Sequence, residues 1–107
     1  MNEKELCSEG RFDILNSYLN QDRKKPFTLG ELIKWAPKNI EHAGSNYKLR
    51  IKHELTPCEV SYFSYEANEH YMDEIVRAMT ASDAMACCMT WLIENGFTDW
   101  DFENCEV

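Results

Sequence analysis

Residues 47–55 read YKLRIKHEL and alternate strictly between two kinds of side chain. One set comprises Tyr47, Leu49, Ile51, His53 and Leu55, and the other comprises Lys48, Arg50, Lys52 and Glu54. A period of two with charge on one side is typical of a strand that buries one face and leaves the other in solvent. This stretch therefore predicts a half-buried β-strand.

The residues that follow predict partners for this strand. Residues 59–66 (EVSYFSYE) are rich in aromatic side chains, and the short link through Thr56 and Pro57 favours an antiparallel hairpin. Residues 70–79 fit helical spacing, and their second half also suits a short strand. We interpret them as a third strand, because a hairpin of two strands alone is only marginally stable.

The clearest helix is predicted at residues 80–96. Thr80 and Asp83 form a T-x-x-D start signal, and Asn95 with Gly96 supplies a stop. Residues 84–93 (AMACCMTWLI) are apolar at every position except Thr90, so nearly the whole circumference of the helix requires burial. Such a helix lies between the sheet and the N-terminal helices, or it gives one face to another subunit.

Two shorter helices are predicted near the N-terminus. Residues 12–20 carry apolar side chains at helical spacing, and Thr28 with Glu31 has the pattern of a capping box, followed by a boundary at Pro37. We expect residues 1–107 to form a single α+β domain. In this fold, N-terminal helices and an apolar C-terminal helix pack on a three-stranded antiparallel sheet, and residues 97–107 form an acidic, aromatic tail.

Charge is distributed unevenly along the chain. Residues 1–56 hold ten Lys/Arg and eight Asp/Glu, a balance of +2, whereas residues 57–107 hold Arg77 alone against eleven Asp/Glu, a balance of -10, and the two sum to -8. An acidic surface repels nucleic acid and membranes and favours basic partners. We therefore expect the partner to be a basic protein surface, with no direct contact to nucleic acid or membrane.

Two groups of residues are candidates for contacting such a partner. One surrounds the later strands, and the other alternates carboxylates with aromatic rings in the tail. The candidates are Glu66, Glu69, Asp73, Glu74, Asp99, Trp100, Asp101, Phe102 and Glu103. Their carboxylates could enter a Lys/Arg-lined groove in place of phosphates, and the tail aromatics could insert as anchors. The alternative is that the charge only maintains solubility and the aromatics close the domain's own core.

The charged face of residues 47–55 carries Lys48, Arg50 and Lys52 in a regular row. A basic row of this kind can contact phosphates, but the chain as a whole is acidic. We interpret the row as a solvated sheet face or as one covered by the acidic tail. Pairing with carboxylates across the sheet is a further alternative.

Motifs of catalysis are missing from the sequence. His53, His70 and Cys58 lack the close paired spacing of zinc ligands, and the five cysteines include no C-x-x-C pair. The sequence has no Gly-rich phosphate loop, no G-x-S-x-G and no H-E-x-x-H. We expect reduced thiols, no metal or cofactor, and a protein that is not an enzyme. No apolar run has the length of a membrane span or the position of a signal peptide, so we expect a cytoplasmic location.

Residues 74–96, EIVRAMTASDAMACCMTWLIENG, resemble the strand-to-helix ending of small phage and prophage proteins, in which a T-x-x-D-A cap leads into an apolar helix. Many acidic phage proteins inhibit bacterial defence, including anti-CRISPR proteins that block nuclease complexes as DNA mimics or wedges. The resemblance implies a non-enzymatic inhibitor in the host cytoplasm that binds a CRISPR effector or another nuclease complex. The alternative is a homo-oligomeric structural or scaffold protein of a mobile element, with a homodimer as the simplest form.

Overall fold

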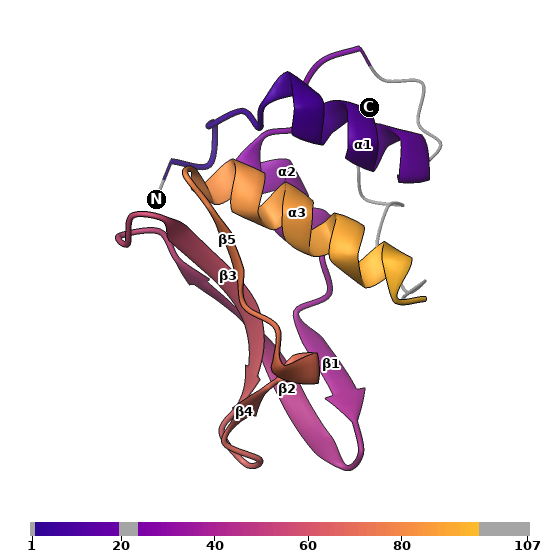
Figure 1. Ribbon diagram of the computed structural model, residues 1–107, viewed down its shortest axis with the longest axis vertical. Coiled ribbons are helices and arrows are strands. Elements are labelled where there is room, and N and C mark those ends of the chain that lie inside the picture. Colours follow the sequence, from indigo (N-terminus) through magenta and orange to yellow (C-terminus); the bar gives the residue numbers. More distant parts are fainter. Residues whose placement is uncertain (1, 20–23, 97–107) are drawn as a thin grey trace.

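The computed structural model describes residues 2–19 and 24–96. Within these residues, two helices come first, five strands form one sheet, and a long helix follows. Figure 1 shows how these elements are arranged. The elements are α1 (Glu9–Leu19), α2 (Leu29–Trp35), β1 (Asn39–His42), β2 (Ser45–Lys52), β3 (Cys58–Ser64), β4 (Glu69–His70), the 3₁₀ turn η1 (Tyr71–Asp73), β5 (Val76–Ala78) and α3 (Ala81–Glu94). The predicted α+β class is confirmed.

The sheet is antiparallel and has the order β1-β2-β3-β4, with β5 also paired to β3. β4 lies beside Phe63 and Ser64, whereas β5 lies beside the other end of β3. The two short strands therefore follow one another along the same edge of β3. The turn η1 separates them, so that the last strand of the sheet is interrupted in its middle.

The alternating stretch forms most of β2, as predicted. Leu49 lies opposite Tyr62 in β3, and Ile51 lies opposite Val60, so these residues share the face that carries the core. The strand ends at Lys52, earlier than predicted, because the chain turns there toward β3. His53 and Leu55, which we expected on the core face, are exposed.

The sheet has more strands than the three that the sequence predicts. The additions are β1 and the two-residue β4. The third strand predicted over residues 70–79 is present only as β5, because residues 71–73 form the turn η1 instead. β1 joins β2 through Ala43 and Gly44, whose φ angles are 52° and 80°. Positive φ at both central residues characterises the type I′ turn, which suits the twist of a two-residue hairpin.

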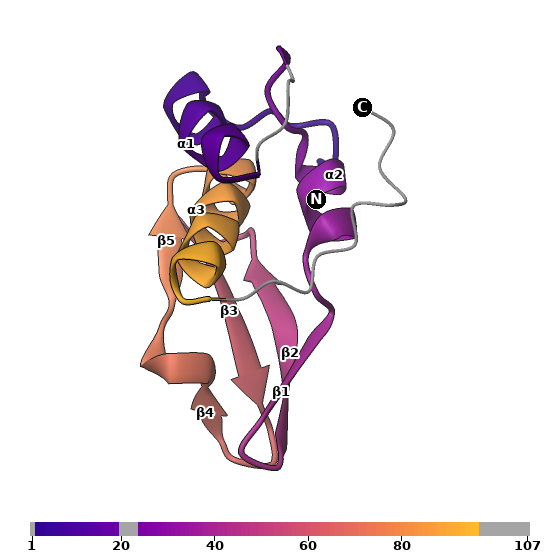
Figure 2. The same ribbon diagram turned by 90° about the vertical axis from the view of Figure 1, so that its right-hand side faces the viewer.

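The helix α3 is the centre of the fold. It packs on β3 and β5 with one side and against α1 and α2 with the other, so it lies between the sheet and the two N-terminal helices (Figures 1 and 2). Met85, Cys88, Met89 and Leu92 are fully or almost fully buried. The chain thus covers the apolar helix by itself, which is the first of the two arrangements that its composition allows.

The N-terminal segment is bound to the start of α3 through hydrogen bonds. The hydroxyl of Thr80 accepts from the backbone N–H of Asp83 at 3.2 Å, which confirms the predicted cap. The carboxylate of Asp83 accepts from the backbone N–H of Ser8 at 2.7 Å, and that of Glu5 accepts from the N–H of Ser82 at 3.0 Å. The first turn of α3 therefore has protein partners from 75 and more residues away in sequence.

The capping box at the start of α2 is formed in full. Oγ1 of Thr28 accepts from the backbone N–H of Glu31 at 3.2 Å, and the Glu31 carboxylate accepts from the N–H of Thr28 at 3.0 Å. The helix ends at Trp35, before Pro37, as predicted. Within the described residues, no helix combines the length and the apolar character that crossing a bilayer requires.

Candidate functional site

Four of the nine predicted contact residues lie in the described part of the chain. Glu66 lies in the turn after β3, Glu69 begins β4, Asp73 ends η1 and Glu74 follows it. All four are exposed. The other predicted contact residues lie outside the described residues; they are Asp99, Trp100, Asp101, Phe102 and Glu103.

Glu69 and Asp73 are brought together around Tyr47. The Tyr47 hydroxyl donates a hydrogen bond of 2.8 Å to Oε1 of Glu69. This bond raises the pKa of Tyr47, and burial and the negative charges of Glu69 and Asp73 raise that pKa further. Both carboxylates therefore raise the pKa of one phenol on β2, which β3 separates from β4 in the sheet.

A group of aromatic rings holds η1 in place. The ring centroid of Tyr71 lies 5.5 Å from that of His42, 5.5 Å from that of Tyr47 and 6.0 Å from that of Trp91. All three pairs meet edge to face, an arrangement that the charge distribution of aromatic rings favours. Tyr71 thus ties η1 to β1, β2 and α3, and Asp73 is carried on a supported turn.

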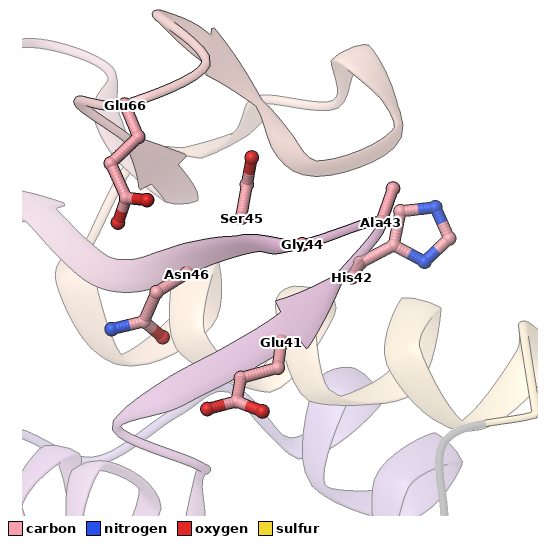
Figure 3. A pocket seen from close by; sticks show the side chains of 7 residues that line it. All are labelled: Glu41, His42, Ala43, Gly44, Ser45, Asn46 and Glu66. Carbon is pink, nitrogen blue, oxygen red and sulfur yellow. The ribbon is translucent and has the colours of Figure 1, made fainter.

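A shallow depression of about 330 Å³ adjoins Glu66 at the β1–β2 turn. Figure 3 shows the Glu66 carboxylate directed toward the strand that carries Ser45 and Asn46, with Glu41 on the neighbouring strand. The lining residues are Glu41, His42, Ala43, Gly44, Ser45, Asn46 and Glu66. One carboxylate from β1, Glu41, and one from the turn after β3, Glu66, make this depression suitable for a cationic side chain of a partner.

We call Glu41, Glu66, Glu69 and Asp73 the acidic end. It includes Glu41, which our sequence reasoning missed because this residue lies in the half of the chain with a positive balance. The predicted Glu74 does not belong to this group. It lies toward α3, where its charge adds to the effect of burial on the pKa of Cys88.

The cysteines of the described residues do not have the features of a nucleophilic thiolate. Cys7, Cys58, Cys87 and Cys88 are free thiols, and burial raises the pKa of Cys87 and raises that of Cys88 to about 12. Thiolates that act as nucleophiles require a lowered pKa instead. Within residues 2–19 and 24–96, no group of three or more His, Cys, Asp or Glu side chains could hold a metal ion.

Comparison of the chain with family models, with curated proteins and with solved structures found no match. Its function is therefore inferred from its own residues and their arrangement.

Proposed function

We propose that the protein acts without catalysis, by binding a basic surface of a nucleic-acid-handling protein through the acidic end. The observation that carries this proposal is that exposed carboxylates lie near one another in two pairs, Glu69 with Asp73 around Tyr47 and Glu41 with Glu66 at the depression beside the β1–β2 turn. Such a group can occupy a groove that otherwise receives phosphates. The resemblance of residues 74–96 to phage proteins supports a bacterial defence complex, such as a CRISPR effector, as the partner.

The Glu69 carboxylate and the turn that carries Asp73 are held in place before any partner arrives, which supports a binding role. Glu69 is fixed by its hydrogen bond from Tyr47, and Asp73 sits on the turn that Tyr71 anchors. Side chains that are already ordered lose less conformational entropy on association. Complementary charge also raises the rate of encounter more than it raises the final affinity.

The direct test is inhibition of a purified CRISPR effector or another bacterial nuclease complex cutting its DNA target. We expect inhibition that saturates at a fixed ratio of protein to complex, since a binding inhibitor does not turn over. Binding should weaken between about 50 and about 500 mM salt, because the contact is made by exposed charges. Inhibition that grows with time at substoichiometric protein would indicate catalysis and would contradict the proposal.

A pair of matched variants locates the contact. Glu41→Gln, Glu66→Gln, Glu69→Gln and Asp73→Asn together remove four charges at the acidic end. The control removes four exposed charges elsewhere, with Glu9→Gln, Asp13→Asn, Glu54→Gln and Glu94→Gln. We expect the association rate to fall at least about tenfold in the first variant only. Equal effects would show that net charge matters and that the acidic end does not.

The structure gives less reason to infer the alternative, a homo-oligomeric scaffold. It depended on an apolar face of residues 84–93 that a second subunit would cover. In the structure, the sheet, α1 and α2 bury most of that helix within one chain, and Cys87, Thr90, Trp91 and Ile93 remain partly exposed.

A further inference from the structure

The residues on the face of the sheet opposite α3, which we call the open face, follow from the strand register. Lys48 lies opposite Phe63, Arg50 opposite Ser61, and Lys52 opposite Glu59, so these six side chains project to the face away from the core. His70 pairs with Phe63 and joins the same face. Within the described residues, no helix covers it (Figure 1).

Aromatic rings gather on one part of this open face. The ring centroid of Phe63 lies 5.0 Å from that of Tyr65 and 4.9 Å from that of His70. The Arg50 guanidinium carbon lies 4.9 Å from the Phe63 centroid, within the range of a cation–π contact. Tyr65 is 76% exposed. Because burial is what makes an apolar ring stabilise a fold, so exposed a ring has no evident role in the core.

The cations of the open face are not neutralised by its carboxylates. Glu59 forms an ion pair of 3.0 Å with Arg77, its neighbour across the β3–β5 pair. Within the described residues, Lys48, Arg50 and Lys52 form no ion pair. Strand geometry spaces these three residues by about 7 Å, in a straight row beside the rings.

We propose that this open face binds single-stranded nucleic acid. Lys48, Arg50 and Lys52 contact successive phosphates, and unpaired bases stack on Tyr65 and on the adjoining Phe63. Base stacking on aromatic side chains next to a cationic track is the general means by which proteins bind single strands. An acidic peptide would use the cations but would have no need of the exposed ring, and a duplex keeps its bases stacked inside.

The acidic net charge led us to expect no contact with nucleic acid, and the open face differs locally from that average. The net charge of -8 averages over the whole chain, whereas Lys48, Arg50 and Lys52 form a local row on the open face. Of the acidic end, Glu41 lies on this face, because it pairs with Asn46. At 0.1 M salt, charges farther than about 10 Å are largely screened, so the neighbouring cations dominate the potential at the row. The variants that test the two proposals share no residue, so either proposal can fail without the other.

The test is fluorescence anisotropy of labelled oligothymidylate and oligouridylate of about 15 nucleotides with the full chain. We expect saturable binding that weakens from about 50 to about 200 mM salt and is stronger than binding to a duplex of equal length. No binding at the lower salt concentration would overturn the proposal. Binding of labelled polyglutamate without binding of the oligonucleotides would also overturn it and would assign the face to acidic peptides.

Variants decide whether binding uses the open face. Tyr65→Ala should weaken it about tenfold, whereas Tyr18→Ala, which removes an exposed ring of α1, should leave it unchanged. Lys48→Gln and Lys52→Gln should each lower the salt dependence by roughly 0.7 in log–log slope, and Lys34→Gln in α2 should not. All five residues are exposed, so circular dichroism should show folded variants. Equal affinities and slopes throughout would overturn the assignment.

Discussion

The hydroxyl of Tyr47 donates a 2.8 Å hydrogen bond to Oε1 of Glu69 and joins β2 to β4 across 22 residues of sequence. Tyr47 itself is buried, whereas Glu69 is exposed. The bond therefore connects the core to a carboxylate of the acidic end. It also explains how a strand of only two residues, β4, keeps a defined position.

Removal of this hydroxyl should destabilise the protein. We expect Tyr47→Phe to lower the free energy of unfolding by about 1 kcal/mol, because one hydrogen bond is lost while the ring stays packed. Urea unfolding followed by circular dichroism measures this value. Tyr18→Phe is the control, since its exposed hydroxyl makes no hydrogen bond within the described residues, and it should have no effect. Equal stabilities of the two variants would contradict the expectation.

The contact between Glu5 and Ser82 should contribute more to stability than the bond between Tyr47 and Glu69. Oε1 of Glu5 accepts from the buried N–H of Ser82 at 3.0 Å and lies 3.1 Å from its hydroxyl oxygen, and Ser82 is fully buried. Glu5→Ala leaves that N–H without its partner, so we expect a loss of about 2 kcal/mol of unfolding free energy. Glu3→Ala, at an exposed position two residues away, should cost much less in the same thermal or urea unfolding experiment.

The β1–β2 turn offers a stabilising substitution. Ala43 has a φ of 52°, a left-handed conformation in which alanine is strained and asparagine is tolerated. Ala43→Asn should therefore raise the free energy of unfolding by about 0.5–1 kcal/mol. Ala67 lies in another turn without a positive φ, so Ala67→Asn should give no such gain. A melting temperature that rises equally in both variants would refute this explanation.

Stability should fall in alkaline solution because of buried thiols. Burial raises the pKa of Cys88 from 9.0 to about 12 in the folded protein. Above pH 9 the unfolded chain releases this proton while the folded chain retains it, so the unfolded state binds fewer protons and the unfolding free energy decreases. One such group contributes up to about 1.4 kcal/mol per pH unit between these two values.

Replacement of the thiol isolates its contribution. Urea unfolding at a series of pH values from 8 to about 11 should show a shallower decrease for Cys88→Ala than for the wild type. Cys87→Ala should show a smaller change of slope, since Cys87 is only half-buried. Parallel curves for the wild type and Cys88→Ala would show that this thiol does not control the alkaline loss.

The parts of the fold that could be predicted are those determined by residues close together in the sequence. The alternation in β2 and the caps at Thr28 and Thr80 are read from a few adjacent positions, and the structure contains all three. β1 escaped prediction because it has only one buried residue, Ile40, and no period can be recognised from one position. Its turn also carries Ala43 where asparagine would have been a strong signal.

The candidate site depends on contacts between distant parts of the chain. The sequence indicates that residues 66–74 are acidic, but the bond from Tyr47 to Glu69 and the packing of Tyr71 on His42 join them to the β1–β2 hairpin. Glu41 enters the acidic end only through that hairpin. Likewise, the sequence does not show that the ring of Tyr65 lies near a cationic row. That follows from the register, which places Phe63, the ring neighbour of Tyr65, beside Lys48.

The interruption between β4 and β5 also affects how molecules of this protein meet. Met72 and Asp73, at φ of 53° and 55°, turn the chain away from the sheet in the middle of its edge. A neighbouring molecule that tried to add a strand there would find no continuous row of backbone donors and acceptors. The opposite edge, β1, has only four residues. We therefore expect the edges of this aromatic-rich β-sheet to resist growth into fibres.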